Sequence, residues 1–250
     1  MIKHYIVLGS SYNTGERIAI DYTDYNEDFK NLIYELKKKK NINENYSIAT
    51  HTISTKTAKW KDVVELDPFF DNVKLLKTSE EFLKYLSKDS EITAIDVANY
   101  ILSMYKCTHT RLEKLVYYCY ADYLCKYNKK LFKDKIFAFK YGPVIETLYE
   151  TYKNSSPTTY VDKFSLKMHD KLPAKYKMPL NSRIMNSIDG VRKIDSIRNT
   201  LEKYKGYNTK TIISFTHREN TPWAANDKGE TLYKVISDYD ILKYHKFEEV

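Results

Sequence analysis

Hydrophobic and polar positions follow one pattern up to about residue 88 and another after it. In the first part, alternating apolar residues in KHYIVL and ERIAIDY predict two strands joined by the loop GSSYNTG. The segments YSIATHTI and WKDVVEL predict two further strands. Apolar residues from Phe29 to Leu36 recur at helical spacing and predict a helix over 25–38 that is capped by Asp24. With a short helix in TSEEFLKYL, these elements predict a small α+β domain over residues 1–88, in the order β-β-α-β-β-α.

The polar stretch SKDSEIT marks the boundary, because the pattern that follows it is helical. Thr93 and Asp96 have the spacing of a capping box and precede an apolar stripe at helical spacing. Thr110 and Glu113 repeat this arrangement before a second stripe. A mainly α-helical domain with a short β element is therefore expected over residues 89–250, and the fold class predicted for the whole chain is α+β.

Two later segments belong to this second domain. Apolar residues from Ile194 to Tyr204 predict a further helix, which ends near Gly206. The segment 163–187 is rich in lysine and interrupted by two prolines, so it predicts an exposed excursion rather than a regular element.

The segment AFKYGPVIETLYETYK, residues 138–153, places Gly142 and Pro143 side by side, although the chain has only 6 glycines and 6 prolines. Glycine adopts backbone angles that are closed to other residues, and proline suits the first turn of a helix. We therefore expect a sharp corner that turns an extended segment into a helix and exposes Tyr141. Such a corner serves either to fix a packing angle or to bind an anion or a partner.

The net charge of +8 and the isoelectric point near 9.0 are compatible with a nucleic-acid partner. They are equally compatible with the codon usage of an AT-rich genome, and the charge is dispersed along the chain, so nucleic acid is not the expected partner. No apolar run approaches the length of a membrane span, and the N-terminus has no signal-peptide pattern. The cysteines Cys107, Cys119 and Cys125 form no C-x-x-C pair and indicate reduced thiols. We expect a cytoplasmic protein that contacts no membrane.

Candidate chemistry is sparse. His217, Glu219 and Pro222 resemble half of the zinc-deaminase signature, but Trp223 follows the proline and there is no cysteine pair to hold zinc. The loop over 9–15 lacks the spacing of a phosphate-binding loop, and Glu16 would repel a phosphate. We therefore expect no catalytic residues, no metal site and no cofactor, and the protein is not expected to be an enzyme.

Three segments, in this order, resemble the Panacea domain of SocA-like antitoxins, a family that includes phage-associated GepA-like proteins. They are AIDVANYILSMY, the stretch from RLEKLVYY to PVIETLYETYK, and FTHRENTPWAAN, and the resemblance covers about residues 92–245. The matching positions are Lys114, Leu115, Tyr117, Tyr118, Leu131, Phe132, Phe139, Lys140, Tyr141, Gly142, Pro143 and Val144 in the second segment, and Thr216, His217, Glu219, Pro222 and Trp223 in the third.

The resemblance implies an antitoxin that binds and neutralises a separate protein toxin, and in SocA-like proteins also an adaptor for a ClpXP-type protease. Two alternatives remain open: a phage or prophage accessory protein that binds a host factor, and a basic nucleic-acid-binding regulator. Residues 1–88 match no family and would set partner choice or placement.

The chain has 24 tyrosines and no catalytic set, so we expect partner recognition by an aromatic surface beside the Gly-Pro corner. Tyr141 and Tyr149 are its candidates, although both rings could instead belong to the core. The positions expected to bind a partner or shape the fold are Lys114, Tyr118, Lys140, Tyr141, Gly142, Pro143, Tyr149, His217, Glu219, Pro222 and Trp223.

Overall fold

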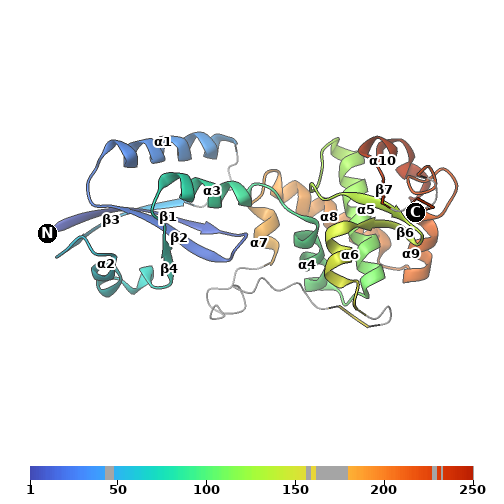
Figure 1. The fold of residues 1–250 in the computed structure, drawn as a ribbon, viewed down its shortest axis with the longest axis horizontal. Coiled ribbons are helices and arrows are strands. Elements are labelled where there is room, and N and C mark those ends of the chain that lie inside the picture. Colours follow the sequence, from blue (N-terminus) through green and yellow to red (C-terminus); the bar gives the residue numbers. More distant parts are fainter. Residues whose placement is uncertain (43–47, 156–158, 162–179, 227–229, 232, 250) are drawn as a thin grey trace. The chain divides into compact units, whose positions relative to one another are not determined.

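The structure is a computed structural model that describes residues 1–42, 48–155, 159–161, 180–226, 230–231 and 233–249. Its contacts divide the chain into two compact units (Figure 1). The first comprises Met1–Glu91 and the described part of 165–188, and the second comprises Ile92–Phe164 and Asp189–Val250. The α+β fold class is confirmed, with a small α+β unit followed by a mainly helical one.

The first unit is built on a four-stranded sheet in the order β3-β1-β2-β4. Its strands are β1 (Ile2–Ser11), β2 (Glu16–Tyr22), β3 (Ile48–Thr55) and β4 (Val73–Leu75). β1 runs antiparallel to both β2 and β3, and β2 runs parallel to β4. The loop GSSYNTG connects β1 and β2 as a hairpin, and Gly15 takes a φ of 74° in its turn.

Helices cover both faces of this sheet. They are α1 (Glu27–Ile42), α2 (Trp60–Leu66), the 3-10 turn η1 (Pro68–Phe70) and α3 (Ser79–Asp89). Figure 1 shows α1 and α3 on one side of the sheet and α2 on the other. Residues such as Leu32 and Phe82 pack with Val7 on the α1 face, while Val63 and Phe70 form a second core on the α2 face.

Two expectations for this unit are wrong. The segment WKDVVEL is the helix α2 and not a strand, because Trp60, Val63 and Val64 reach the core at helical spacing rather than by alternation. The observed order is therefore β-β-α-β-α-β-α. The cap of α1 is Asn26, which accepts a hydrogen bond from the Phe29 amide at 3.0 Å, and not Asp24.

The second unit is a helical domain around α5 (His109–Tyr127), a nineteen-residue helix that is buried on nearly all sides. The other helices are α4 (Ala94–Met104), α6 (Glu146–Tyr152), α8 (Gly190–Tyr204), α9 (Thr209–Thr216), α10 (Asp238–Tyr244) and the 3-10 turn η5 (His245–Phe247). A small antiparallel sheet in the order β6-β5-β7 consists of β5 (Ile136–Phe139), β6 (Gly142–Ile145) and β7 (Lys234–Val235).

One predicted capping box is confirmed and the other is wrong. At α4, the Thr93 and Asp96 side chains bond to each other's backbone amides. At α5 the cap is Thr108, which accepts from the Arg111 amide. Because the helix begins there, Glu113 lies in its second turn and points into the core.

Most of the predicted excursion over 163–187 lies outside the described residues. Its end, however, forms a helix, α7 (Leu180–Met185), in the first unit. The guanidinium of the buried Arg183 donates to the carbonyls of Asp89 at 2.9 Å and Lys88 at 3.1 Å. This end of the segment is therefore regular and partly buried, because Arg183 binds the main chain at the C-terminal end of α3. Among the described helices, none has both the length and the apolar character that crossing a bilayer requires.

Candidate functional site

The Gly-Pro corner is a hairpin turn. β5 and β6 pair with Phe139 opposite Gly142, so Lys140 and Tyr141 form a two-residue turn, and Gly142 has a φ of 100°. The expectation that Pro143 opens a helix is wrong, because Gly142–Ile145 is a strand and α6 begins only at Glu146. Proline is tolerated here since β6 lies at the edge of its sheet.

The second and third motif segments converge on Gly142. A Cβ atom added to this glycine would lie 2.8 Å from Oγ1 of Thr216, 3.3 Å from Cε1 of His217 and 3.3 Å from Cε of Lys114. These neighbours come from the end of α9 and from α5. Glycine is needed here for two reasons: its positive φ and the close approach of three side chains.

Two buried charged residues of α5 hold β6 in place. The Lys114 ammonium donates to the Pro143 carbonyl at 2.5 Å, and the Glu113 carboxylate accepts from the Ile145 amide at 3.0 Å. Burial lowers the pKa of Lys114 to about 8, although the negative charges of Glu113 and Glu248 oppose that shift. Both side chains are therefore engaged in positioning the strand.

The segment THRENTPW holds the end of β5 in a similar way. The indole N–H of Trp223 donates to the Phe139 carbonyl at 2.7 Å, and the Trp223 ring packs 4.1 Å from that of His217. Nδ1 of His217 lies 2.9 Å from the Ile213 carbonyl, which it bonds. Pro222 is buried beside the tryptophan. The imidazole is thus part of the scaffold that fixes the hairpin.

Exposed and half-buried aromatic side chains lie at the hairpin and next to it, on the solvent side of these buried residues. Tyr141, at the tip of the hairpin, is 70% exposed. Phe139 and Tyr149 are half-buried with ring centroids 5.4 Å apart, and Phe139 lies at the same distance from the exposed Tyr233. We call Phe139, Tyr141, Tyr149 and Tyr233 the aromatic surface. Lys140 borders it, with its ammonium 5.8 Å from the Tyr141 ring.

The sequence-predicted positions thus separate into two groups. The buried positions around the hairpin are Lys114, Gly142, Pro143, Pro222 and Trp223, and His217 is half-buried beside them. Lys140, Tyr141 and Tyr149 reach the surface. Tyr118 lies deeper, where its hydroxyl donates to the Ile212 carbonyl and its ring stacks on Tyr204 at 4.2 Å. Glu219 is exposed and does not join the cluster in the part of the chain that the structure describes.

A buried polar network around His245 was missed from the sequence. Its imidazole bonds Asp122 at 2.7 Å through Nε2 and Glu248 at 2.8 Å through Nδ1. Burial alone would lower the pKa of His245, but the hydrogen bonds to the two carboxylates outweigh it and raise the pKa to about 9. His245 and Glu248 are only three residues apart, but the sequence does not show that Asp122, 123 positions before His245, packs against them.

Asp122, His245 and Glu249 also place possible metal-ligand atoms within 4.8 Å of one another. Both imidazole nitrogens are already engaged by carboxylates. The Lys203 ammonium lies 3.7 Å from Asp122 and 3.4 Å from Glu249, so a cation already stands between these acids. The geometry fits an ion-pair network rather than a metal site.

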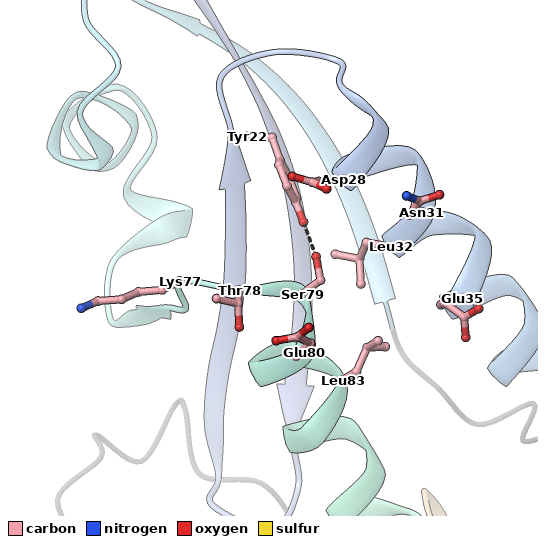
Figure 2. Close-up of a pocket in the computed structure, with 10 residues that line it drawn as sticks. All are labelled: Tyr22, Asp28, Asn31, Leu32, Glu35, Lys77, Thr78, Ser79, Glu80 and Leu83. Carbon is pink, nitrogen blue, oxygen red and sulfur yellow. Dashed lines mark hydrogen bonds between the residues drawn. The ribbon is translucent and has the colours of Figure 1, made fainter.

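The first unit contains a cleft of about 410 Å³ between α1, β2 and the start of α3 (Figure 2). The hydroxyl groups of Tyr22 and Ser79, which both line the cleft, are hydrogen-bonded to each other at 2.8 Å. Figure 2 shows that the carboxylates of Asp28, Glu35 and Glu80 do not meet at one point. The cleft therefore lacks the convergent polar groups of a specific small-molecule site.

Comparison with known families bears on the second unit. A family model described as "Antitoxin SocA-like, Panacea domain" matches residues 112–224. This confirms the resemblance predicted from the motifs, over a shorter range than 92–245. The matched range contains the whole hairpin scaffold, from Lys114 to Trp223. No curated protein and no solved structure gave a match.

Proposed function

We propose that this protein, which carries an antitoxin SocA-like Panacea domain at residues 112–224, is a non-catalytic antitoxin that binds and neutralises a separate protein toxin. The toxin would be held on the aromatic surface. The observation that carries the proposal is that the motif residues buried around Gly142 fix a hairpin whose tip exposes Tyr141.

The bonding of the motif residues favours binding over catalysis. The polar side chains of Lys114, His217 and Trp223 each bond a main-chain carbonyl. A general base or nucleophile needs a free atom that can reach a substrate. The Lys114 ammonium is buried and bonded to the backbone, the Trp223 indole can only donate, and His217 is held to the backbone through Nδ1. Such a set serves to hold a shape.

The aromatic surface has the properties of a protein-binding site. Tyrosine brings a large contact area and a hydroxyl group at a low cost in side-chain entropy, and it is enriched at binding hot spots. The hairpin is tied to the core at Phe139, Pro143 and Ile145, so little backbone freedom would be lost on binding.

The proposal has two finer parts. The first is a division of roles: residues 1–88 form a separate domain that sets partner choice or placement, and residues 89–250 form the domain that binds the toxin. The second is that the protein delivers the toxin to a ClpXP-type protease, which the family resemblance alone supports.

Co-expression tests the proposal. The product of the neighbouring gene is expressed from an inducible promoter, with and without the full chain, and growth and co-purification are scored. We expect that the neighbouring product arrests growth, and that the full chain restores growth and purifies with it. Growth that the chain does not restore, or rescue without any complex between the two proteins, would contradict direct neutralisation. Capture of a host protein in place of the neighbouring product would favour the accessory-protein alternative.

A further inference from the structure

The strand β3 leaves a long, regular edge on the sheet of the first unit. It pairs with β1 without interruption from Ile2 opposite Thr55 to Gly9 opposite Ile48, and it is the last strand in the order β3-β1-β2-β4. An edge strand presents every second main-chain N–H and C=O outward, unpaired, over its full length. Eight residues of such an edge are a template for another strand.

The composition of this edge lacks the residues that usually protect an edge strand. The sequence IATHTIST contains no lysine, no other charged residue and no proline. The other edges among the described strands differ. β4 has only three residues and carries Lys74, β6 contains Pro143, and β7 has two residues. Short strands, lysine and proline all hinder pairing with a further strand, so β3 is the edge that remains open.

The two faces of β3 carry different side chains. Thr50 lies opposite Val7 and Thr52 lies opposite Tyr5, on the face that α1 and α3 cover. Both threonines are exposed, and the half-buried Ser54 continues the row. One face of this edge is therefore a line of hydroxyl groups, without charge.

We propose that β3 pairs antiparallel with β3 of a second copy of this chain, about a two-fold axis normal to the sheet. Paired residues must lie on the same face, so the two simplest registers place Thr52 opposite Thr52, or Thr50 opposite Thr52. In both, hydroxyl side chains meet hydroxyl side chains on this face, a favourable cross-strand pairing. No Lys, Arg, Asp or Glu residues of β3 face each other, and the second register places the two His51 rings opposite each other on the other face.

Self-pairing explains the composition of the edge better than a foreign strand does. On the face of Thr50 and Thr52, β3 offers no charged or aromatic side chain with which to select an unrelated partner, and the His51 ring on the other face packs on Phe69 and Phe70. A two-fold interface, by contrast, needs only to match itself. The two sheets would join into one continuous sheet and satisfy the open edges of both copies. This inference is independent of the proposed antitoxin function.

The test changes the charge of the edge in the full chain. The Lys variant carries Thr50→Lys and Thr52→Lys, and the Glu variant carries Thr50→Glu and Thr52→Glu. A control adds the same two charges elsewhere on the first unit, as Thr23→Lys and Asn31→Lys, both at exposed positions. Sedimentation velocity over a concentration series measures the mass of each protein and of a mixture of the Lys and Glu variants.

We expect the unmodified chain and the control to form dimers of twice the 29.6 kDa of one chain. In either register the Lys variant brings lysines opposite each other, so its dimer should dissociate about tenfold more readily, and the same holds for the Glu variant. The mixture should recover the dimer, because opposite charges then face each other.

Three results would overturn the proposal. The first is an unmodified chain that is monomeric at every concentration. This result would overturn self-pairing even if the edge variants bound another protein more weakly, since β3 would then pair with that protein instead. The second is a dimer that both edge variants leave unchanged, because it would use a different surface. The third is a mixture of the Lys and Glu variants that stays monomeric.

Discussion

The ammonium group of Lys114 donates a hydrogen bond of 2.5 Å to the main-chain carbonyl of Pro143 and thereby ties the central helix of the second unit to an edge strand. Lys114 is 2% exposed, so the bond forms away from water. A buried carbonyl without a partner is costly, and a buried ammonium is costly as well. Each group therefore offsets the burial cost of the other, and the lysine belongs to the scaffold.

Replacing this lysine tests that role. Lys114→Met keeps the volume and the apolar stem but leaves the Pro143 carbonyl without its donor. We expect a loss of about 1–3 kcal/mol in the free energy of unfolding, because a buried acceptor stays unsatisfied. Urea denaturation followed by circular dichroism measures it. Unchanged or increased stability would show that removing a buried charge outweighs the lost bond.

Gly142 should not tolerate a side chain. Gly142→Ala places a Cβ atom 2.8 Å from Oγ1 of Thr216 at a backbone φ of 100°, and we expect destabilisation by about 1–3 kcal/mol. Gly206→Ala is the matched control, because a Cβ there has no neighbour within 4 Å and its φ is not in the left-handed range. Thermal melts compare the two variants. Equal melting temperatures would mean that the hairpin relaxes without cost.

Replacing Tyr141 tests whether its ring binds a partner or belongs to the core. Because the ring is 70% exposed, Tyr141→Ala should leave the melting temperature nearly unchanged. It should weaken binding to the co-purified toxin by about thirtyfold, or roughly 2 kcal/mol. Tyr160→Ala removes a ring of similar exposure, 62%, and should bind normally. Calorimetric titration gives both affinities, and equal values for the two variants would remove Tyr141 from the binding site.

His245 should make stability depend on pH. Its pKa is raised to about 9 from an ordinary value of 6.5, so the folded state holds the proton more tightly. The resulting stabilisation is fully present below pH 6.5 and is lost as the pH rises through 9. Lys114, whose pKa is lowered to about 8, contributes the opposite slope above pH 8.

Between pH 6.5 and 8 the loss of stability from His245 outweighs the opposing contribution of Lys114, which is only half titrated at pH 8. The unmodified chain should lose roughly 1–2 kcal/mol of unfolding free energy across this range, and His245→Gln should lose much less. Urea denaturation at steps of half a pH unit measures both proteins. If the unfolding free energies of the two proteins changed in parallel with pH, the His245 imidazole, which is bonded to Asp122 and Glu248, would not titrate in this range.

Arg183 should protect the C-terminal end of α3 from proteolysis. Its guanidinium bonds the carbonyls of Lys88, Asp89 and Glu91. Arg183→Ala should raise the rate of tryptic cleavage after Lys88 several-fold, because local opening becomes easier. Arg192→Ala removes an exposed arginine and should leave that rate unchanged. Gel electrophoresis with mass spectrometry follows the cut.

The products of that cut also test the proposed division of the chain. Fragments 1–88 and 89–250 correspond to the two proposed domains. Circular dichroism of the isolated fragment 89–250 should show a cooperative helical melt. An unfolded or insoluble fragment would contradict a separate second domain.

The sequence by itself determined the features that depend on near neighbours. The strands β1 and β2, the capping box at Thr93 and the helix that ends at Tyr204 follow from alternation, from side-chain caps three residues away and from helical spacing. Asp24 and Thr110 were wrongly chosen as caps, because several polar residues stand near each helix start and the sequence does not show which of them bonds a free amide; Asn26 and Thr108 do.

The tertiary structure alone decided where the motif residues lie and what they bond. Lys114 and Pro143 are 29 positions apart, Phe139 and Trp223 are 84 apart, and Asp122 and His245 are 123 apart. Local pattern carries no information on such pairs. A buried polar group must find a partner, and that partner is whichever group the packing of helices and strands brings within 3 Å. For this reason Pro143 stands in a strand held by a buried lysine, although its sequence suits the start of a helix equally well.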